Sequence, residues 1–111
     1  MSPEARDIAA DIAAVGKTAT LRRVAPGGLI WFDVTVKAAE RQYSLQELSG
    51  QIAEGDREVR ISNKEILEHS WPGPPRRGDE IELAGALCAV EAVETKTIGD
   101  ESVMHILQAR G

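Results

Sequence analysis

This sequence is poor in aromatic side chains, contains one cysteine and carries more acidic than basic residues. Aromatic residues make up only 4% of its 111 residues, so the core must be built from valine, isoleucine, leucine and alanine. We expect such a thin core to draw part of its stability from subunit contacts. A single cysteine, Cys88, excludes an internal disulfide and fits a reducing compartment. The length corresponds to one domain, residues 1–111.

Long apolar runs and basic leader segments are also missing. No stretch approaches the roughly 18 apolar residues of a membrane span, and the acidic, alanine-rich N-terminus has no basic region of the kind that begins a signal peptide. We therefore expect a soluble intracellular protein without a membrane partner. A formal net charge of −5 argues against a protein that grips nucleic-acid phosphates. The basic pairs Arg22-Arg23 and Arg76-Arg77 lie beside predicted turns, where a solvated or subunit-facing role is predicted.

Catalytic and metal-binding patterns are missing from the sequence as well. His69 and His105 are its only histidines, and with one cysteine they offer no zinc-ligand spacing. His105 alternates with Val103 and Leu107, which predicts that it packs at a sheet face, and Cys88 is predicted to be a small core residue. No phosphate-binding loop, nucleophile elbow or dinucleotide fingerprint occurs. The sequence therefore predicts a protein that is not an enzyme and has no cofactor and no metal.

Two Gly-Asp pairs are the most informative feature that is present. Gly accepts positive φ and Asp bonds nearby backbone, so Gly55-Asp56 and Gly78-Asp79 predict turns. After each pair, apolar residues recur at every second position, which is the period of a half-buried strand. These residues are Val59 and Ile61 after the first pair, and Ile81 and Leu83 after the second.

A short amphipathic helix is predicted over residues 3–15, within an N-terminal segment 1–16. Ser2 suits the N-cap, Pro3 the first helical position and Gly16 the stop. The helix is expected to pack over one end of the domain's own sheet, with an apolar side formed by Ile8, Ile12 and Val15. Its small-residue side also makes it a candidate interface, formed by Ile8, Ala9, Ile12 and Ala13.

The remainder, residues 17–111, predicts a small antiparallel β-barrel or sandwich of about six strands. Ala84-Gly85 is predicted to be a hairpin turn, Asn63 to cap a short turn at 64–68, and residues 71–75 to form a rigid crossing. The predicted strands cover residues 18–24, 29–38, 59–62, 80–83, 87–96 and 102–109. The predicted core consists of Val34, Val36, Val59, Ile61, Ile81, Leu83, Val90 and Leu107.

Residues about 40–54 are predicted to form a long loop. A helical turn at 44–48, with Ser44 as cap and Glu47 three residues on, is one interpretation, and irregular loop throughout is the other. Loops of this length are usually functional or mobile, so we predict that it is mobile in the free protein and ordered in an assembly. Its candidate contact residues, toward a partner or a channel lumen, are Tyr43, Leu45, Glu47, Leu48, Gln51 and Glu54.

Three patterns in the second half of the chain carry a family resemblance. They are Gly55-Asp56-Arg57-x-Val59-x-Ile61, then Pro75-x-x-Gly78-Asp79-x-Ile81-x-Leu83-x-Gly85-x-Leu87-x-x-Val90-x-x-Val93, and finally Leu107-Gln108-Ala109-Arg110. Through these patterns the chain resembles the head–tail joining proteins of tailed bacteriophages, also called head-completion, attachment or stopper proteins. The resemblance covers residues 50–111, departs from the family at Cys88 (where many relatives carry an aromatic), and extends to the first half only in layout.

This resemblance implies a structural virion protein of the phage neck, assembled in the host cytoplasm. A ring of identical subunits would dock beneath the portal and its adaptor, meet the tail-terminator protein, and let double-stranded DNA pass without binding it specifically. One alternative is a small binding module of OB or SH3 type for a peptide or single-stranded nucleic acid. Another is a tail-terminator or minor tail protein.

Overall fold

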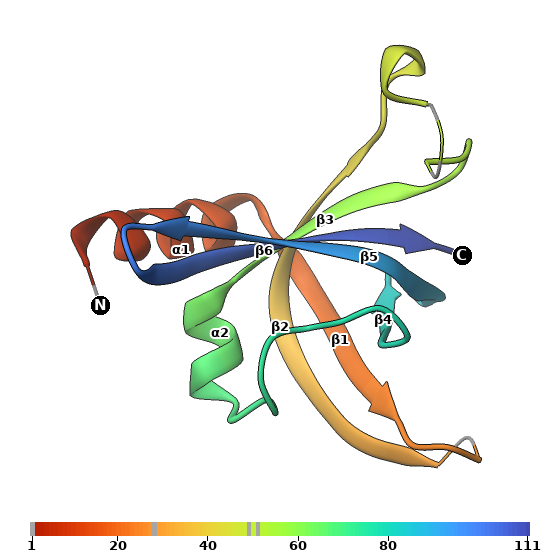
Figure 1. Ribbon diagram of the computed structural model, residues 1–111, viewed down its shortest axis with the longest axis horizontal. Coiled ribbons are helices and arrows are strands. Elements are labelled where there is room, and N and C mark those ends of the chain that lie inside the picture. Colours follow the sequence, from red (N-terminus) through yellow and green to blue (C-terminus); the bar gives the residue numbers. More distant parts are fainter. Residues whose placement is uncertain (1, 28, 49, 51) are drawn as a thin grey trace.

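The computed structural model describes residues 2–27, 29–48, 50 and 52–111, and within them six antiparallel strands close into a barrel (Figure 1). The strand order is β1-β2-β3-β6-β5-β4. This confirms the predicted small β-barrel with an N-terminal helix. No described helix is long and apolar enough to cross a bilayer. The elements are α1 (Pro3–Val15), β1 (Lys17–Val24), β2 (Ile30–Gln42), the 3-10 turn η1 (Leu45–Glu47), β3 (Arg57–Ser62), α2 (Asn63–Glu68), β4 (Glu80–Leu83), β5 (Ala86–Ile98) and β6 (Glu101–Arg110).

The shortest strand, β4, closes the barrel. It pairs with β1 on one side and with β5 on the other, so that Ile81 lies opposite both Leu21 and Cys88. The link to β5 is the predicted hairpin turn, in which Ala84 has a φ of +49° and Gly85 a φ of +84°. Two positive φ values in succession are the mark of a type I′ turn, which matches the twist of the strands it joins.

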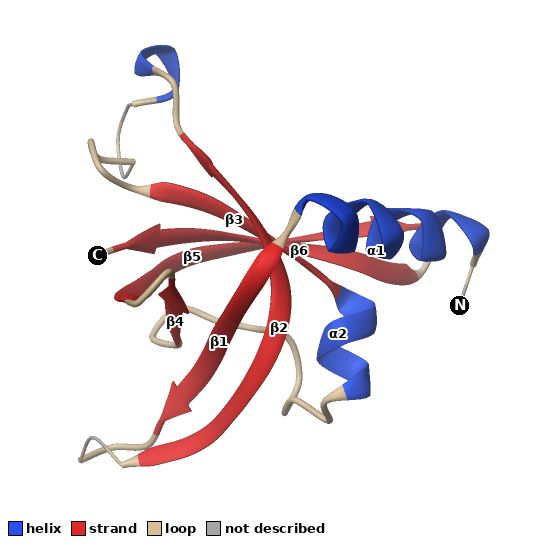
Figure 2. Ribbon diagram, turned by 180° about the vertical axis from the view of Figure 1, so that it is seen from behind, coloured by secondary structure: helices blue, strands red, loops and turns tan. Residues whose placement is uncertain are grey.

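The N-terminal helix α1 packs against β2, β3 and β6 of its own barrel (Figure 2). Ser2 caps it by accepting a hydrogen bond from the Ala5 backbone N–H at 3.1 Å. The buried side is formed by Ala5, Ala9 and Ile12, one turn earlier than the predicted apolar side. Val15 remains 74% exposed, because the chain turns into β1 directly after it and the small alanines allow the closer approach to the sheet.

Gly16 ends α1 because the backbone leaves no room for a side chain there. A Cβ at this position would lie 2.5 Å from the carbonyl oxygen of Ile12 and 3.0 Å from that of Ala38. We expect Gly16→Ala to lower the free energy of unfolding by about 1–3 kcal/mol, as other overpacked sites do, in a urea titration. Ala14→Ser, at an exposed helix position, should stay within about 0.5 kcal/mol of the parent. Equal stabilities for the two variants would refute this reason for the glycine.

The segment predicted as a short turn at 64–68 is the helix α2, and its cap is Ser62, not Asn63. The Ser62 hydroxyl accepts from the Glu65 backbone N–H at 3.3 Å. The Asn63 amide oxygen is used elsewhere, because it accepts a hydrogen bond from His105. The prediction of Asn63 as the cap was therefore wrong. Serine and asparagine are both good N-cap residues, and Ser62, which precedes the helix, has the extended backbone conformation that an N-cap requires.

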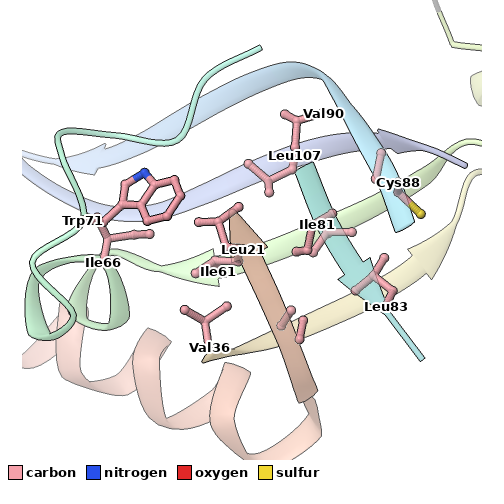
Figure 3. Close-up of a cluster of buried hydrophobic side chains, with 14 residues drawn as sticks. Leu21, Val36, Ile61, Ile66, Trp71, Ile81, Leu83, Cys88, Val90 and Leu107 are labelled. Carbon is pink, nitrogen blue, oxygen red and sulfur yellow. The ribbon is translucent and has the colours of Figure 1, made fainter. Parts of the chain in front are cut away.

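Figure 3 shows the buried apolar side chains that fill the interior of the barrel. Seven of the eight predicted core residues are buried, and Val34 is half-buried against the same cluster. Trp71 and Ile66 join the core from outside the strands and fill one end of the barrel. The Phe32 and Trp71 rings pack edge to face, with ring centroids 6.0 Å apart. The predicted crossing at 71–75 thus contributes a large side chain to the core, and Cys88 is buried there as predicted.

His105 faces the interior with Val103 and Leu107, as the alternation predicted. Its Nε2 lies 2.8 Å from Asn63 Oδ1, and its Nδ1 lies 2.9 Å from Thr95 Oγ1. Since the amide oxygen only accepts, Nε2 carries the proton and Nδ1 accepts from the threonine hydroxyl. The ring is therefore satisfied in its neutral form, and its burial lowers the pKa of His105.

This pKa shift predicts that acid destabilises the protein. As pH falls below the ordinary histidine value of about 6.5, the unfolded chain binds a proton that the folded chain resists, so the free energy of unfolding falls, by at most about 1.4 kcal/mol per pH unit from this residue. Urea titrations between pH 7 and 5 should show this slope, and His105→Gln should reduce it. His69→Gln, at an exposed histidine, is the control and should keep the His105 contribution. An unchanged slope in His105→Gln would count against the prediction.

Candidate functional site

The candidate site is the loop of residues 43–56 that joins β2 to β3, here called the 43–56 loop. It projects from the barrel on the side away from α1, near the C-terminus (Figure 1). β2 runs as far as Gln42, where it pairs with Arg57 of β3, so the predicted loop start at residue 40 was three residues too early. The helical-turn interpretation of 44–48 is confirmed in its central part by η1.

Ion pairs hold the start of the loop. Arg41 contacts Glu47 at 2.9 and 2.8 Å through its two terminal nitrogens, and one of these also contacts Glu58 at 2.7 Å. Glu47 accepts the Ser44 backbone N–H at 2.9 Å, which is the bond that the glutamate makes in the predicted capping arrangement. The Tyr43 ring lies under the Arg41 guanidinium, 5.6 Å from its centroid. One arginine therefore links the end of β2, the turn η1 and β3.

The charges in this cluster stabilise one another. The Arg41 hydrogen bonds hold the pKa of Glu47 at about 2, and they raise the pKa of Arg41 itself. Burial raises the pKa of Glu58, but hydrogen bonds from Arg41 and Arg60 outweigh burial, so this pKa lies below its usual range. Burial also raises the pKa of the Tyr43 hydroxyl. The cluster stays charged and paired at neutral pH, as a positioning device for the loop.

Asp56 holds the end of the loop. Its carboxylate is buried and accepts from Arg110 Nε and Nη2, each at 2.8 Å, and from Gln108 Nε2 at 2.8 Å. It also accepts the Ala53 backbone N–H at 2.9 Å, closing the turn in which Gly55 has a φ of +91°. The Arg110 guanidinium holds the pKa of Asp56 well below its usual range. The loop is thus tied to the last strand, β6.

The second Gly-Asp pair repeats this construction. Asp79 accepts the Arg76 backbone N–H at 2.8 Å and pairs with Arg23 through two contacts of 2.7 and 2.9 Å. Arg23 also donates to the carbonyl oxygens of Pro72 and Pro74 at 2.8 and 3.1 Å. The prediction of a solvated or subunit-facing Arg23 was therefore wrong, because this side chain is buried and holds the proline-rich crossing.

Two hollows flank the 43–56 loop. Tyr43, Leu48 and Glu54 line one of them, so the structure brings these predicted residues together. Arg77, Gln108 and Arg110 line the other, on the β6 side. Glu47 is instead engaged by Arg41. Leu45 begins η1, its side chain lies outside what the structure describes, and Gln51 lies outside the described residues.

The four candidate interface residues of α1 divide into two groups. Ala9 and Ile12 are buried against this chain's own barrel, so they do not offer a partner surface. Ile8 is half-buried and Ala13 is exposed. The predicted packing of the helix on its own sheet is confirmed. This packing buries Ala9 and Ile12, two of the four predicted interface residues.

The mobility predicted for residues 44–54 stays a prediction, with a structural reason. The backbone hydrogen bonds that the described loop residues make are local, from Glu47 to Ser44 and from Asp56 to Ala53. Segments without backbone bonds to the sheet open at low free-energy cost. In the free protein, amide exchange at 44–54 should be faster than at Val34 and Val36 of β2, whose backbone groups point toward β1. Equal protection of 44–54 and of these two amides would contradict the prediction.

The charges of this site position the loop. The carboxylates of Glu47, Asp56 and Glu58 face guanidiniums, and among the described residues no group of three His, Cys, Asp or Glu side chains could hold a metal ion. Cys88 is buried, and burial raises the pKa of its thiol. Comparison with protein-family models and with curated proteins gives no match for this chain.

Proposed function

We propose that this chain is a structural subunit of the neck of a tailed bacteriophage. In this role a ring of identical copies joins the DNA-filled head, through the portal and its adaptor, to the tail. The observation that carries the proposal is the 43–56 loop: it projects from a closed barrel, and buried or paired charges fix both its ends. A loop held in this way can reach a neighbouring protein or the channel without disturbing the barrel.

The overall charge supports the same role. A formal net charge of −5 would keep a channel wall from holding DNA phosphates, so the genome could pass. The proposed partners are therefore other copies of this chain, the portal or adaptor, and the tail terminator, in the virion neck. The resemblance to head–tail joining proteins, carried by the two Gly-Asp turns and the strands after them, is the second support.

The binding-module alternative has less support. Single-stranded nucleic acid and peptides are usually bound on exposed aromatic rings. Here Trp71 is buried, Phe32 and Trp71 pack edge to face, and Tyr43 lies against Arg41. These are the three aromatic side chains that the structure describes, and all three contribute to the fold. A tail-terminator or minor tail protein would share the proposed ring architecture, so only an assembly experiment separates that alternative.

The test uses purified full-length protein and DNA-filled heads, lacking this protein, from the phage that encodes it. Addition of the protein should make the heads retain their DNA and accept tails, measured as infectious particles. If the protein instead completes isolated tails, the tail-terminator alternative replaces the proposal. If it acts on neither particle, the neck assignment is wrong.

A matched pair of variants tests the loop itself. Glu54→Lys changes an exposed residue of the 43–56 loop, and Glu68→Lys makes the same change at an exposed position of α2. Glu54→Lys should lower the yield of infectious particles, and Glu68→Lys should leave it close to that of the parent. Equal yields from both would exclude the loop as the contact.

A further inference from the structure

We propose that neighbouring copies of this chain join edge to edge, with the outer edge of β2 in one copy pairing antiparallel with the outer edge of β5 in the next. This inference deepens the proposed function, on which it rests, by naming the contact between ring subunits. It is carried by two strand edges that the closed barrel leaves open and by the charges along them.

The first open edge belongs to β5. Residues 86–89 of this strand pair with β4, and residues 89–98 pair with β6. Along residues 92–98, no described strand pairs with the side away from β6, and residues 94–98 are exposed on both faces of the ribbon. An exposed strand with one unpaired edge is a template for another strand.

The second open edge belongs to β2. Only its last part, residues 38–42, pairs with β3, while residues 30–38 pair with β1 on the other side. The Lys37 backbone N–H points to the outer edge, where it donates to Glu65 Oε1 at 3.2 Å. Because backbone groups alternate in direction along a strand, those of Asp33 and Thr35 point to the same edge. In the described part of the chain no strand lies beside Asp33 and Thr35, whereas the Lys37 N–H is already bonded to Glu65 of α2. The edge open to another copy is therefore residues 33–35.

The positions of the two edges suit a head-to-tail contact. The β5–β6 hairpin and the β1–β2 hairpin extend from different sides of the barrel (Figures 1 and 2). A contact between two different surfaces of identical subunits continues from copy to copy and closes into a ring when the rotation permits. One chain therefore carries both halves of the joint.

The charges along the edges select the antiparallel orientation. The outward face of β2 carries Asp33 and then Lys37, and the outward face of β5 carries Glu94 and then Lys96, all exposed. Antiparallel pairing places each acid opposite or diagonal to a base of the neighbouring copy. Parallel pairing would bring like charges together, which destabilises a strand pair. Antiparallel pairing also brings the exposed Ile30 and Ile98 to the same end of the joint.

The present partners of these charges are weak enough to exchange. Lys96 pairs with Glu94 at 3.1 Å, and Lys37 Nζ donates to Thr18 Oγ1 at 3.1 Å, both on the surface. Asp33 has no ion-pair partner among the described residues. A lysine on an edge strand, such as Lys96 on β5, often serves only to prevent aggregation. That role does not explain why the edge of β2 carries the complementary pattern of charges, Asp33 and then Lys37.

Zero-length carbodiimide cross-linking tests the joint directly, because it links only carboxylates and amines in contact. A mixture of unlabelled and ¹⁵N-labelled full-length protein separates links between copies from links within one copy. At concentrations where the protein self-associates, or on heads, mass spectrometry should find Asp33 linked to Lys96 and Glu94 linked to Lys37 between copies. Links between copies that map to other surfaces would overturn the inference.

Charge reversal supplies the second test. Lys96→Glu places like charges across the joint and should weaken self-association about 3- to 10-fold in sedimentation experiments. Asp33→Lys should do the same. The double variant Asp33→Lys/Lys96→Glu should recover to within about twofold of the parent. Lys17→Glu, at the exposed start of β1 and on neither open edge, is the matched control and should associate like the parent.

The outcomes separate this inference from the proposed function. Completion of heads together with unchanged association in the charge variants would overturn the joint and leave the neck role in place. Association that follows the charge pattern, without any effect on heads, would support the joint and overturn the neck role. No self-association, either alone or on heads, would overturn both.

Discussion

Replacing Asp79 by alanine is expected to lower the free energy of unfolding by about 3–5 kcal/mol, the usual result of breaking a buried ion pair from one side. Asp79 is 1% exposed and its partner Arg23 is 4% exposed. Without the carboxylate, the Arg23 guanidinium stays buried with only two proline carbonyls to accept its hydrogen bonds. The turn before β4 also loses the bond from the Arg76 backbone N–H.

A urea or thermal unfolding curve measures this loss, and the chain supplies a matched control. Asp100 also follows a glycine in a turn but is exposed, so Asp100→Ala should change the stability by about 0.5 kcal/mol or less. The double variant Arg23→Leu/Asp79→Ala also removes the buried, unpaired guanidinium charge of Arg23, so it should be more stable than Asp79→Ala alone. A loss below about 1 kcal/mol for Asp79→Ala would show that the pair does not hold the crossing.

The number and approximate positions of the strands could be predicted from the sequence, because the residues that determine them are close together in the chain. Alternating apolar residues and Gly-containing turns identified six strands, the Ala84-Gly85 hairpin and seven buried core residues. Strand ends were less accurate: β2 continues to Gln42 because β3 supplies pairing partners there, which no residue near 40 could reveal. The closed barrel order likewise depends on long-range pairing.

The ion pairs were not readable in the same way. Gly-Asp predicts a turn from two adjacent residues, but the arginine that fills each turn comes from far away, Arg23 for Asp79 and Arg110 for Asp56. A basic residue beside a turn looks solvated from sequence alone. The available signal for Arg23 was its position, since it lies on the same side of β1 as the buried Ala19 and Leu21.

The candidate site was located correctly as a segment and incompletely as a set of residues. Tyr43, Leu48 and Glu54 meet at one hollow, whereas Arg41 and Asp56, which fix the loop, were not among the predicted contact residues. Their role depends on partners in β3 and β6. For α1, the helical period was right, but Ala5, Ala9 and Ile12 form the buried side, and Val15 is exposed.

Ile81→Ala is the second change with a large expected effect, a loss of about 2–5 kcal/mol if the site collapses no more than typical buried positions do. Ile81 is 0% exposed and lies at the middle of β4, between Leu21 and Cys88 of the neighbouring strands. Leu87→Ala is the matched control, because Leu87 is 49% exposed on the adjoining strand; it should cost far less. A loss below about 0.5 kcal/mol for Ile81→Ala would mean that the two faces of β4 are exchanged.

The same strand connects this prediction with the first one. β4 has four residues; Asp79 fixes the turn before it, and Ile81 packs into the barrel core beneath it. If closure of the barrel depends on β4 as a unit, the two losses should not add: once Asp79→Ala has released the strand, Ile81→Ala should cost less than it does alone. Additive losses would instead indicate that the ion pair and the core packing stabilise the barrel independently.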